Sequence, residues 1–304
     1  MCIMSNKLKL KTKEDIQNLR YSGRVLAQAL AKMVEATRPG ISTKALDDIA
    51  YKYIKSIDGC EPALLNYKPY GADYPFPASI CISVNEAVVH GIPDDYELVE
   101  RDVVSYDGCV KYKGMISDSA LTVIVTSDGC ITIKDILKKV EDYNQERLKS
   151  GNNSQAAEMN EHKLSVLTEA EQLLYVTYKS MWKGIDQAKI GNNISHISKA
   201  IENYISKMGE ELGSPYGIVK SFSGHGVGYH VHEEPYVPNY DDGEKGPRID
   251  EGLVLAIEPM VTLGTDEIEI IEDGYTALTI DGSIAAHFEH TVVAGKDGGE
   301  VLTQ

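Results

Sequence analysis

Three histidines lie close together in the stretch SGHGVGYHVHEEP, and two glutamates follow the last of them. The histidines are His225, His230 and His232, and the glutamates are Glu233 and Glu234. Imidazole is a common metal ligand, and near neutral pH it also transfers protons or donates hydrogen bonds to a substrate. The stretch alone does not assign these roles, so partner residues must come from elsewhere in the chain.

Two aspartates lie in a predicted β-hairpin. The runs DVVSYDGCV and MISDSALTVIV flank the short link KYKG, as two paired strands do. If the turn centres on Tyr112 and Lys113, Asp107 and Asp118 face each other directly, with Cβ atoms about 4.5–5.5 Å apart. Opposed carboxylates destabilise a sheet unless one is protonated or a cation lies between them. In this register, the pair predicts a cation site.

Two glutamates lie in predicted strands that are otherwise apolar. Glu258 interrupts GLVLAIEPMVTLG, and Glu289 interrupts AAHFEHTVVAG. An unpaired buried carboxylate costs several kcal/mol, so such groups pair or bind metal. Alternation along an edge strand could instead point either side chain to solvent. The combination of both glutamates with the aspartate pair and the histidine segment favours a metal site.

The ligand types indicate a class of metal and of chemistry. Oxygen ligands with one imidazole suit Mn, Fe, Co or Zn, and four carboxylates exceed what one such ion needs. Two divalent ions that share bridging carboxylates fit this count. Paired ions about 3.5–4 Å apart bind one hydroxide between them and polarise a scissile carbonyl.

These residues need a scaffold, and helices are the first part of it that the sequence predicts. Thr12 followed by Asp15 indicates a helix start, and a second helix begins near Ser42 or Thr43. The apolar pattern of the second helix recurs 151 residues later, again after a long helical segment. This repeat predicts two related halves within one domain, residues 1–304.

The segment 131–165 differs from the rest of the chain. Its first part has the pattern of a polar amphipathic helix, and SGNNSQ has the composition of a loop. We interpret the segment as a surface insertion between the two halves. Its basic residues make the ribosome a candidate partner, although acidic residues are interspersed among them.

Composition limits the partners and the compartment. The 304 residues carry a formal net charge of −16, which argues against direct nucleic-acid binding because phosphates require a basic face. Five cysteines without C-x-x-C spacing predict reduced thiols in a cytoplasm. The sequence has neither a signal-peptide core nor an apolar run of about 18 residues, so we expect neither secretion nor membrane spanning.

The assembled motifs resemble those of type I methionine aminopeptidases. The resemblance covers nearly the whole chain except 131–165, and its motifs occur in the order and approximate spacing of that family. They are RPGISTKALD, FPASICISVNEAVVHGIPDD, SDSALTV, GHGVGYHVHEEP, AIEPMV and FEHTVV. The resemblance implies the pita-bread fold, an α/β fold of the α+β type. In this fold, two halves related by a pseudo-two-fold axis each pack helices on a curved antiparallel sheet. The family is commonly monomeric.

The resemblance also implies a role for each candidate residue. It gives the five metal ligands as Asp107, Asp118, His225, Glu258 and Glu289. In this assignment Asp118 and Glu289 bridge two ions, His225 binds one of them, and Glu258 also accepts a proton from the attacking water. Outside the ligand set, two histidines are catalytic and contact substrate. His90 contacts the scissile amide, and His232 donates a hydrogen bond to the carbonyl as it becomes an oxyanion. His230 is read as a rim or structural residue.

The substrate pocket departs from the family pattern at two positions. Tyr275 stands in DGYT where tryptophan is common, and Val231 stands where an aromatic residue is common. Phe76 and Cys81 keep the expected apolar character. A pocket of aromatic, sulfur and aliphatic groups, with Phe76, Cys81 and Tyr275 in contact with substrate, still suits an unbranched thioether.

The predicted activity is removal of the initiator methionine from nascent chains, with a small second residue preferred as the family implies. A hydroxide bridging the two ions would attack the methionyl carbonyl. One alternative is an X-Pro dipeptidase or aminopeptidase P, which shares the fold but usually carries a further N-terminal domain. A catalytically inactive binding protein on this fold is the other; such proteins typically lose metal ligands, whereas this chain keeps the whole set.

Overall fold

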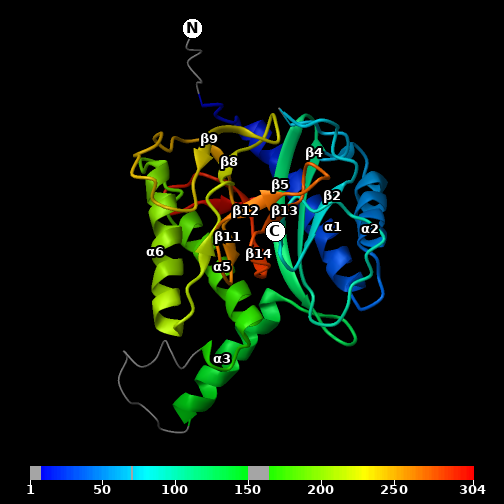
Figure 1. Cartoon of the computed structure of the whole chain (residues 1–304). Coiled ribbons are helices and arrows are strands. Elements are labelled where there is room, and N and C mark those ends of the chain that lie inside the picture. Colours follow the sequence, from blue (N-terminus) through cyan, green and yellow to red (C-terminus); the bar gives the residue numbers. More distant parts are fainter. Residues whose placement is uncertain (1–7, 70, 150–163) are drawn as a thin grey trace.

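The structure is a computed structural model that describes residues 8–69, 71–149 and 164–304. One helix pair lies on each side of a central group of antiparallel strands (Figure 1). The helices are α1 (Lys13–Ala36), α2 (Thr43–Ser56), α3 (Ile133–Lys149), α5 (Glu169–Ile185) and α6 (Ile194–Leu212). The strands before α3 are β1 (Cys60–Pro62), β2 (Ile80–Val84), β3 (Ala87–Val89), β4 (Val103–Tyr112), β5 (Met115–Val125) and β6 (Cys130–Ile131). The strands after α6 are β7 (Gly217–Ile218), β8 (Gly224–Gly226), β9 (Glu233–Val237), β10 (Val254–Ile257), β11 (Met260–Thr262), β12 (Ile268–Ile270), β13 (Ala277–Thr279), β14 (Ala285–His287), β15 (His290–Val293) and β16 (Glu300–Val301).

The first half packs α1 and α2 on a five-stranded sheet with the order β1-β4-β5-β6, in which β2 also pairs with β4. The predicted capping box is present, because Thr12 accepts the backbone N–H of Asp15 and the Asp15 carboxylate accepts that of Thr12. Leu26, Leu30 and Met33 of α1 are buried against this sheet. Burial of this apolar stripe fixes the helix on the long β4–β5 hairpin.

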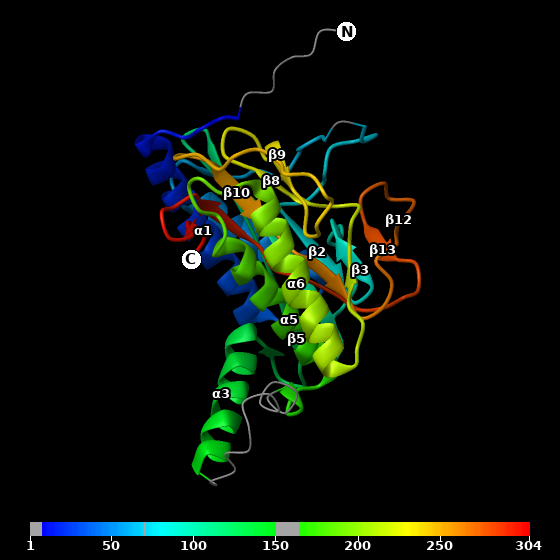
Figure 2. The same ribbon diagram turned by 90° about the vertical axis from the view of Figure 1, so that its left-hand side faces the viewer.

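The second half repeats the helix pair with α5 and α6, in front of the strands in Figure 2. Gly40 and Gly191, just before α2 and α6, have φ angles of +83° and +100°, a backbone region that favours glycine. Leu46 of α2 and its predicted counterpart Ile197 of α6 are both fully buried. The predicted duplication of a helix pair is therefore confirmed. Here the strands have the orders β16-β15-β10-β8-β9 and β14-β11-β7.

The predicted register of the β4–β5 hairpin is wrong, because the turn lies one residue further along the chain than predicted. The turn lies on Lys113 and Gly114, which both have positive φ angles (48° and 82°), as a two-residue type I′ turn requires. Asp107 is therefore paired with Ala120, and Asp118 with Cys109. The two aspartates are diagonal neighbours instead of directly opposed. Because strand faces alternate with a period of two, both carboxylates still lie on the same face.

The two halves meet along β5 and the segment from β14 to β15. The Asp118 N–H donates to the Thr291 hydroxyl at 2.8 Å, and that hydroxyl donates back to the Asp118 carbonyl, also at 2.8 Å. Ala120 and Glu289 exchange backbone hydrogen bonds of 3.4 and 3.0 Å. This junction carries Asp118 and Glu289 toward each other from opposite halves of the chain.

The predicted insertion 131–165 contains α3, which projects away from the rest of the molecule in both views (Figures 1 and 2). Ile136 and Val140 of α3 are nevertheless buried in the larger apolar core, and Lys139 forms an ion pair with Glu171 of α5 at 3.0 Å. Residues 150–163 lie outside the described part, so the insertion as a whole stays a prediction. Within the described ranges, none of the helices combines the length and apolarity needed to cross a membrane.

Candidate metal centre

One cavity between the two halves is lined by every residue to which the sequence analysis assigned a site role. These residues are Phe76, Cys81, His90, Asp107, Asp118, His225, His232, Glu258, Tyr275 and Glu289. They come from both halves of the chain, and from strands, strand breaks and loops that are far apart in sequence. We use "floor" for the five predicted metal ligands, Asp107, Asp118, His225, Glu258 and Glu289. We use "wall" for Phe76, Cys81, Val231 and Tyr275, which also line the cavity.

Two breaks between neighbouring strands place the glutamates of the floor. Glu258 lies between β10 and β11, and Glu289 lies between β14 and β15. β10 pairs with β15 and β11 pairs with β14, so the two breaks are adjacent in space. Both side chains line the cavity, and Glu289 is 1% exposed. The sheet interruption therefore brings both carboxylates inward, as their apolar surroundings predicted.

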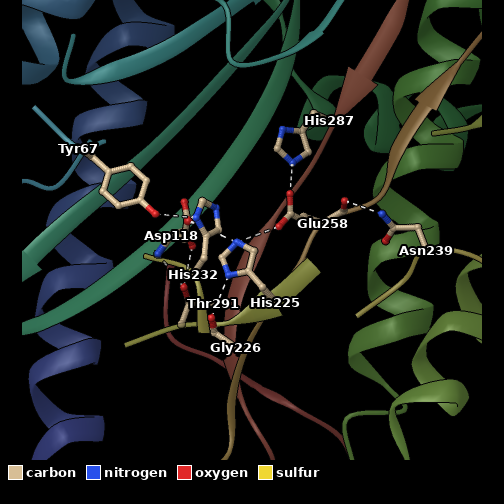
Figure 3. A network of polar contacts seen from close by, with 9 residues as sticks. All are labelled: Tyr67, Asp118, His225, Gly226, His232, Asn239, Glu258, His287 and Thr291. Atoms are coloured by element: carbon tan, nitrogen blue, oxygen red, sulfur yellow. Dashed lines mark hydrogen bonds and ion pairs between the residues drawn. The ribbon is translucent and has the colours of Figure 1, made fainter. Parts of the chain in front are cut away.

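His225 lies at the centre of the floor. Its Nδ1–H donates to the Gly226 carbonyl at 3.0 Å, so Nε2 is the ring nitrogen that faces the carboxylates and can serve as a metal ligand. Nε2 lies 3.2 Å from Glu258 Oε1 and 4.0 Å from Asp118 Oδ2 (Figure 3). Ligand atoms of Asp118, His225 and Glu289 all lie within 4.8 Å of one another. This grouping fits a shared metal ion.

Burial makes the carboxylates of the floor costly without a cation. It raises the pKa of Asp107 and of Glu289 well above their ordinary values, and that of Asp118 to about 6. Burial alone would also raise the pKa of Glu258, but hydrogen bonds from His225 and His287 outweigh it and hold this pKa at about 2. The floor is thus a desolvated cluster of acids, and among the described residues that line the cavity only imidazoles can balance their charge.

Unpartnered oxygens support the same conclusion. Among the described residues, Asp118 Oδ1 and Glu289 Oε1 are buried without a hydrogen-bond partner. A buried carboxylate oxygen in this condition costs free energy unless a cation or proton satisfies it. The oxygen-rich donor set with one imidazole nitrogen is the kind that Mn, Fe, Co or Zn accepts. The residues present therefore fit a divalent metal.

The two predicted catalytic histidines lie on the open side of the floor. His90 has a φ angle of 61°, unusual for a residue other than glycine, and its ring packs edge-on against Phe222 with centroids 5.0 Å apart. Burial lowers the pKa of His90 to about 4, so its ring is neutral at pH 7. His232 Nδ1 lies 3.0 Å from the Tyr67 hydroxyl, and its ring lies 4.5 Å from that of His225. His230 is exposed, as its interpretation as a rim residue requires.

The wall forms an apolar side pocket beside the floor. Tyr275 packs edge-on against Phe76 with ring centroids 5.3 Å apart, and its hydroxyl donates to the Tyr74 carbonyl. Cys81 is buried in the same cluster. Val231 packs with Cys109 in a separate apolar cluster that also lines the cavity. The space beside the predicted metal ligands is therefore lined by the phenol ring of Tyr275, the phenyl ring of Phe76, two thiols and the side chain of Val231.

Sequence reasoning missed several residues that line the cavity, and three of them contact predicted site residues through polar groups or strand pairing. His287 lies on the floor side of the cavity, with Nε2 3.5 Å from Glu258 Oε2. Cys109 faces Asp118 across the hairpin, and Tyr67 contacts His232. A signal for His287 did exist, because it stands two positions before Glu289 near the end of a strand. The contact of Tyr67 depends on the path of a loop, which no local pattern reveals.

Comparison with known proteins agrees with this geometry. The model of metallopeptidase family M24 matches residues 17–172 and 157–296, which together span most of the chain. The chain belongs to metallopeptidase family M24. A methionine aminopeptidase from Clostridium perfringens is 36% identical over 97% of this chain and 98% of its own length. One from Borreliella burgdorferi is 40% identical over 94% of each chain.

Solved structures of M24 proteins separate the two enzyme groups named above. The crystal structure of methionine aminopeptidase from Rickettsia prowazekii superposes with a TM-score of 0.77 at 30% identity, covering 98% of this chain and 100% of that one. The prolidase from Pyrococcus furiosus gives a TM-score of 0.62 at 18% identity, and only 65% of that chain is covered. The prolidase likeness shows the pita-bread fold alone. The fold prediction is confirmed, and the methionine aminopeptidases match over their full length.

Proposed function

We propose that this M24 protein is a metal-dependent methionyl aminopeptidase that removes the initiator methionine from nascent chains. The observation that carries the proposal is the position of an apolar wall directly beside a floor of metal ligands. Such a site holds an uncharged, flexible side chain next to the group that is cleaved. Full-length similarity to methionine aminopeptidases supports the same activity.

The floor would hold two divalent ions. Asp118 and Glu289, which meet from opposite halves, and His225 through Nε2 would hold these ions. Asp107 and Glu258 complete the ligand set. The bound ions would polarise the scissile carbonyl and lower the pKa of the attacking water. Mn, Fe, Co and Zn all suit these ligands.

The remaining residues orient the substrate and move protons. If the Tyr67 hydroxyl donates to Nδ1 of His232, the neutral ring carries its proton on Nε2 and can donate to the carbonyl oxygen as negative charge develops. His90, neutral at pH 7, contacts the scissile amide. Glu258, whose carboxylate lines the cavity, would accept the proton of the attacking water as the general base. The wall holds the thioether of methionine.

Preference for a small second residue, a cytoplasmic location and a monomeric state belong to the same proposal. The partners are the N-termini of nascent polypeptides, and the ribosome is a further candidate because α3 carries basic residues beyond the molecular body. The net charge of −16 supports the absence of direct nucleic-acid binding.

The test measures hydrolysis of Met-Ala-Ser and of Gly-Pro by chelator-treated protein, before and after addition of Mn²⁺, Fe²⁺ or Co²⁺. Metal-dependent release of methionine from Met-Ala-Ser alone is the expected result. Cleavage of Gly-Pro instead would assign the protein to the X-Pro peptidases. A folded, metal-bound protein that cleaves neither peptide would be an inactive binding protein.

A further inference from the structure

His287 is a buried imidazole in the cavity that the proposed mechanism does not use. It ends β14 and is 1% exposed. Thr122 of β5 fixes its backbone: the His287 N–H donates to the Thr122 hydroxyl at 2.9 Å, and this hydroxyl donates to the His287 carbonyl at 2.7 Å. Met260 is its partner across the β11–β14 ladder. The position of the ring is therefore set by contacts from both halves of the chain.

The ring of His287 points to the carboxylate of Glu258. Its Nε2 lies 3.5 Å from Oε2, while His225 Nε2 lies 3.2 Å from Oε1, so Glu258 is held between two imidazoles (Figure 3). Among the described residues, neither ring nitrogen of His287 has a partner at normal hydrogen-bond geometry, and its ion-pair contact is the one with Glu258 at 3.5 Å. A fully buried imidazole with no other partner is costly, so this contact is the one that explains its presence.

Metal binding would change the two imidazoles in different ways. Nε2 is the ring nitrogen of His225 that faces the floor, so on losing its proton His225 would leave Glu258 and bind an ion. His287 would then remain the partner of Oε2. A hydrogen bond from a neighbouring group to the other oxygen of a ligating carboxylate fixes the orientation of that carboxylate. Loss of such a hydrogen bond typically weakens metal binding.

We propose that His287 is a positioning residue that donates its Nε2–H to Glu258 Oε2 and thereby turns Oε1 toward the metal site. This inference rests on the proposed function, because it assumes that Glu258 is a metal ligand. The alternative is that His287 itself binds the ion as an additional nitrogen ligand. A glutamine at this position distinguishes the two roles. Its amide N–H can donate to the Glu258 carboxylate, but its side chain is a poor substitute for an imidazole as a metal ligand.

The experiment compares His287→Leu and His287→Gln with the wild-type protein. Binding of Co²⁺ to chelator-treated protein is measured by calorimetry, and the visible absorption of the Co²⁺ form reports the coordination. His287→Leu should weaken Co²⁺ binding by about 10–100-fold, and His287→Gln should restore it to within about threefold of wild type with an unchanged spectrum. His290→Leu removes a partly buried imidazole that contacts Thr303 and Trp182 instead of the floor, and this variant should bind Co²⁺ as wild type does.

Two results would overturn the proposal. One is a folded His287→Leu protein, with thermal unfolding like that of His290→Leu, that binds Co²⁺ as tightly as wild type. The other is a His287→Gln protein with the same loss of affinity and the same altered spectrum as His287→Leu, which would make His287 a direct ligand. Wild-type protein that binds Co²⁺ but releases no methionine from Met-Ala-Ser would refute the proposed function and leave the role of His287 measurable.

Discussion

The floor and the wall of the cavity are adjacent, but they are built in different ways. Floor residues lie on β4, β5 and β8 or at breaks between strands, and backbone hydrogen bonds across the junction fix Asp118 and Glu289. Most of the wall comes from loops, and it is held by ring packing between Phe76 and Tyr275. The chemistry of the floor depends on atomic positions, whereas the wall has only to provide a volume of the right polarity. Substitutions should therefore have much larger effects in the floor.

The largest effect is expected from Glu289→Gln. Glu289 is the carboxylate that the second half contributes to the junction, and an amide cannot bridge two cations as a carboxylate does. We expect kcat/KM for Met-Ala-Ser to fall by about 10³-fold or more, which corresponds to about 4 kcal/mol of transition-state stabilisation. Steady-state kinetics with measured metal content would check this. Glu269→Gln, a matched change at an exposed position on β12, should keep wild-type activity. If both variants were equally active, Glu289 would not be a metal ligand.

A somewhat smaller effect is expected at the open side of the floor. His232→Ala removes the proposed donor to the developing oxyanion, so kcat should fall by about 10²–10³-fold while KM changes little. Tyr67→Phe leaves His232 in place but removes the hydroxyl that lies 3.0 Å from its Nδ1, and we expect kcat to fall by about 10-fold. Kinetics of both variants on Met-Ala-Ser provide the test. A loss that appears only in KM would show that His232 binds the ground state and does not stabilise the transition state.

The charge of the floor predicts how pH affects the metal-free protein. Burial lowers the pKa of His225, but the hydrogen bond with Glu258 outweighs it and raises this pKa to about 9. The folded state then holds the proton more tightly than the unfolded chain, so this stabilisation is complete below pH 6.5 and is lost as the pH rises through 9. The raised pKa values of Asp107 and Glu289 act in the same direction.

Urea unfolding of chelator-treated protein at pH 7 and pH 9 would measure this effect. We expect a lower free energy of unfolding at pH 9, and a smaller difference in a His225→Gln variant, which lacks the titrating ring. Saturation with Mn²⁺ should also reduce the difference, because a bound cation replaces the proton as the partner of the carboxylates. Stability that rises between pH 7 and pH 9 would contradict the electrostatic account of the floor.

The sequence predicted the floor better than the contacts around it. Period-two alternation placed Asp107 and Asp118 on one face even though the register was wrong, because a shift of the turn by one residue keeps both faces. Gly114 was the overlooked signal, since a type I′ turn favours glycine at its second position. The partners of Tyr67 and His287 depend on loop paths and on adjacent strand breaks, which local patterns do not encode.

The smallest effect is expected in the wall, from Tyr275→Phe. This change removes the hydrogen bond to the Tyr74 carbonyl and keeps the ring that packs on Phe76. We expect a loss of about 1 kcal/mol in unfolding free energy and less than about fivefold change in kcat/KM for Met-Ala-Ser. Tyr275→Ala, which opens the pocket, should lower kcat/KM further, mainly through KM, because binding of the thioether is lost. A fall of 100-fold or more in Tyr275→Phe would give the hydroxyl a part in the chemistry. The wall would then have to be positioned as exactingly as the floor, and the contrast between them would not hold.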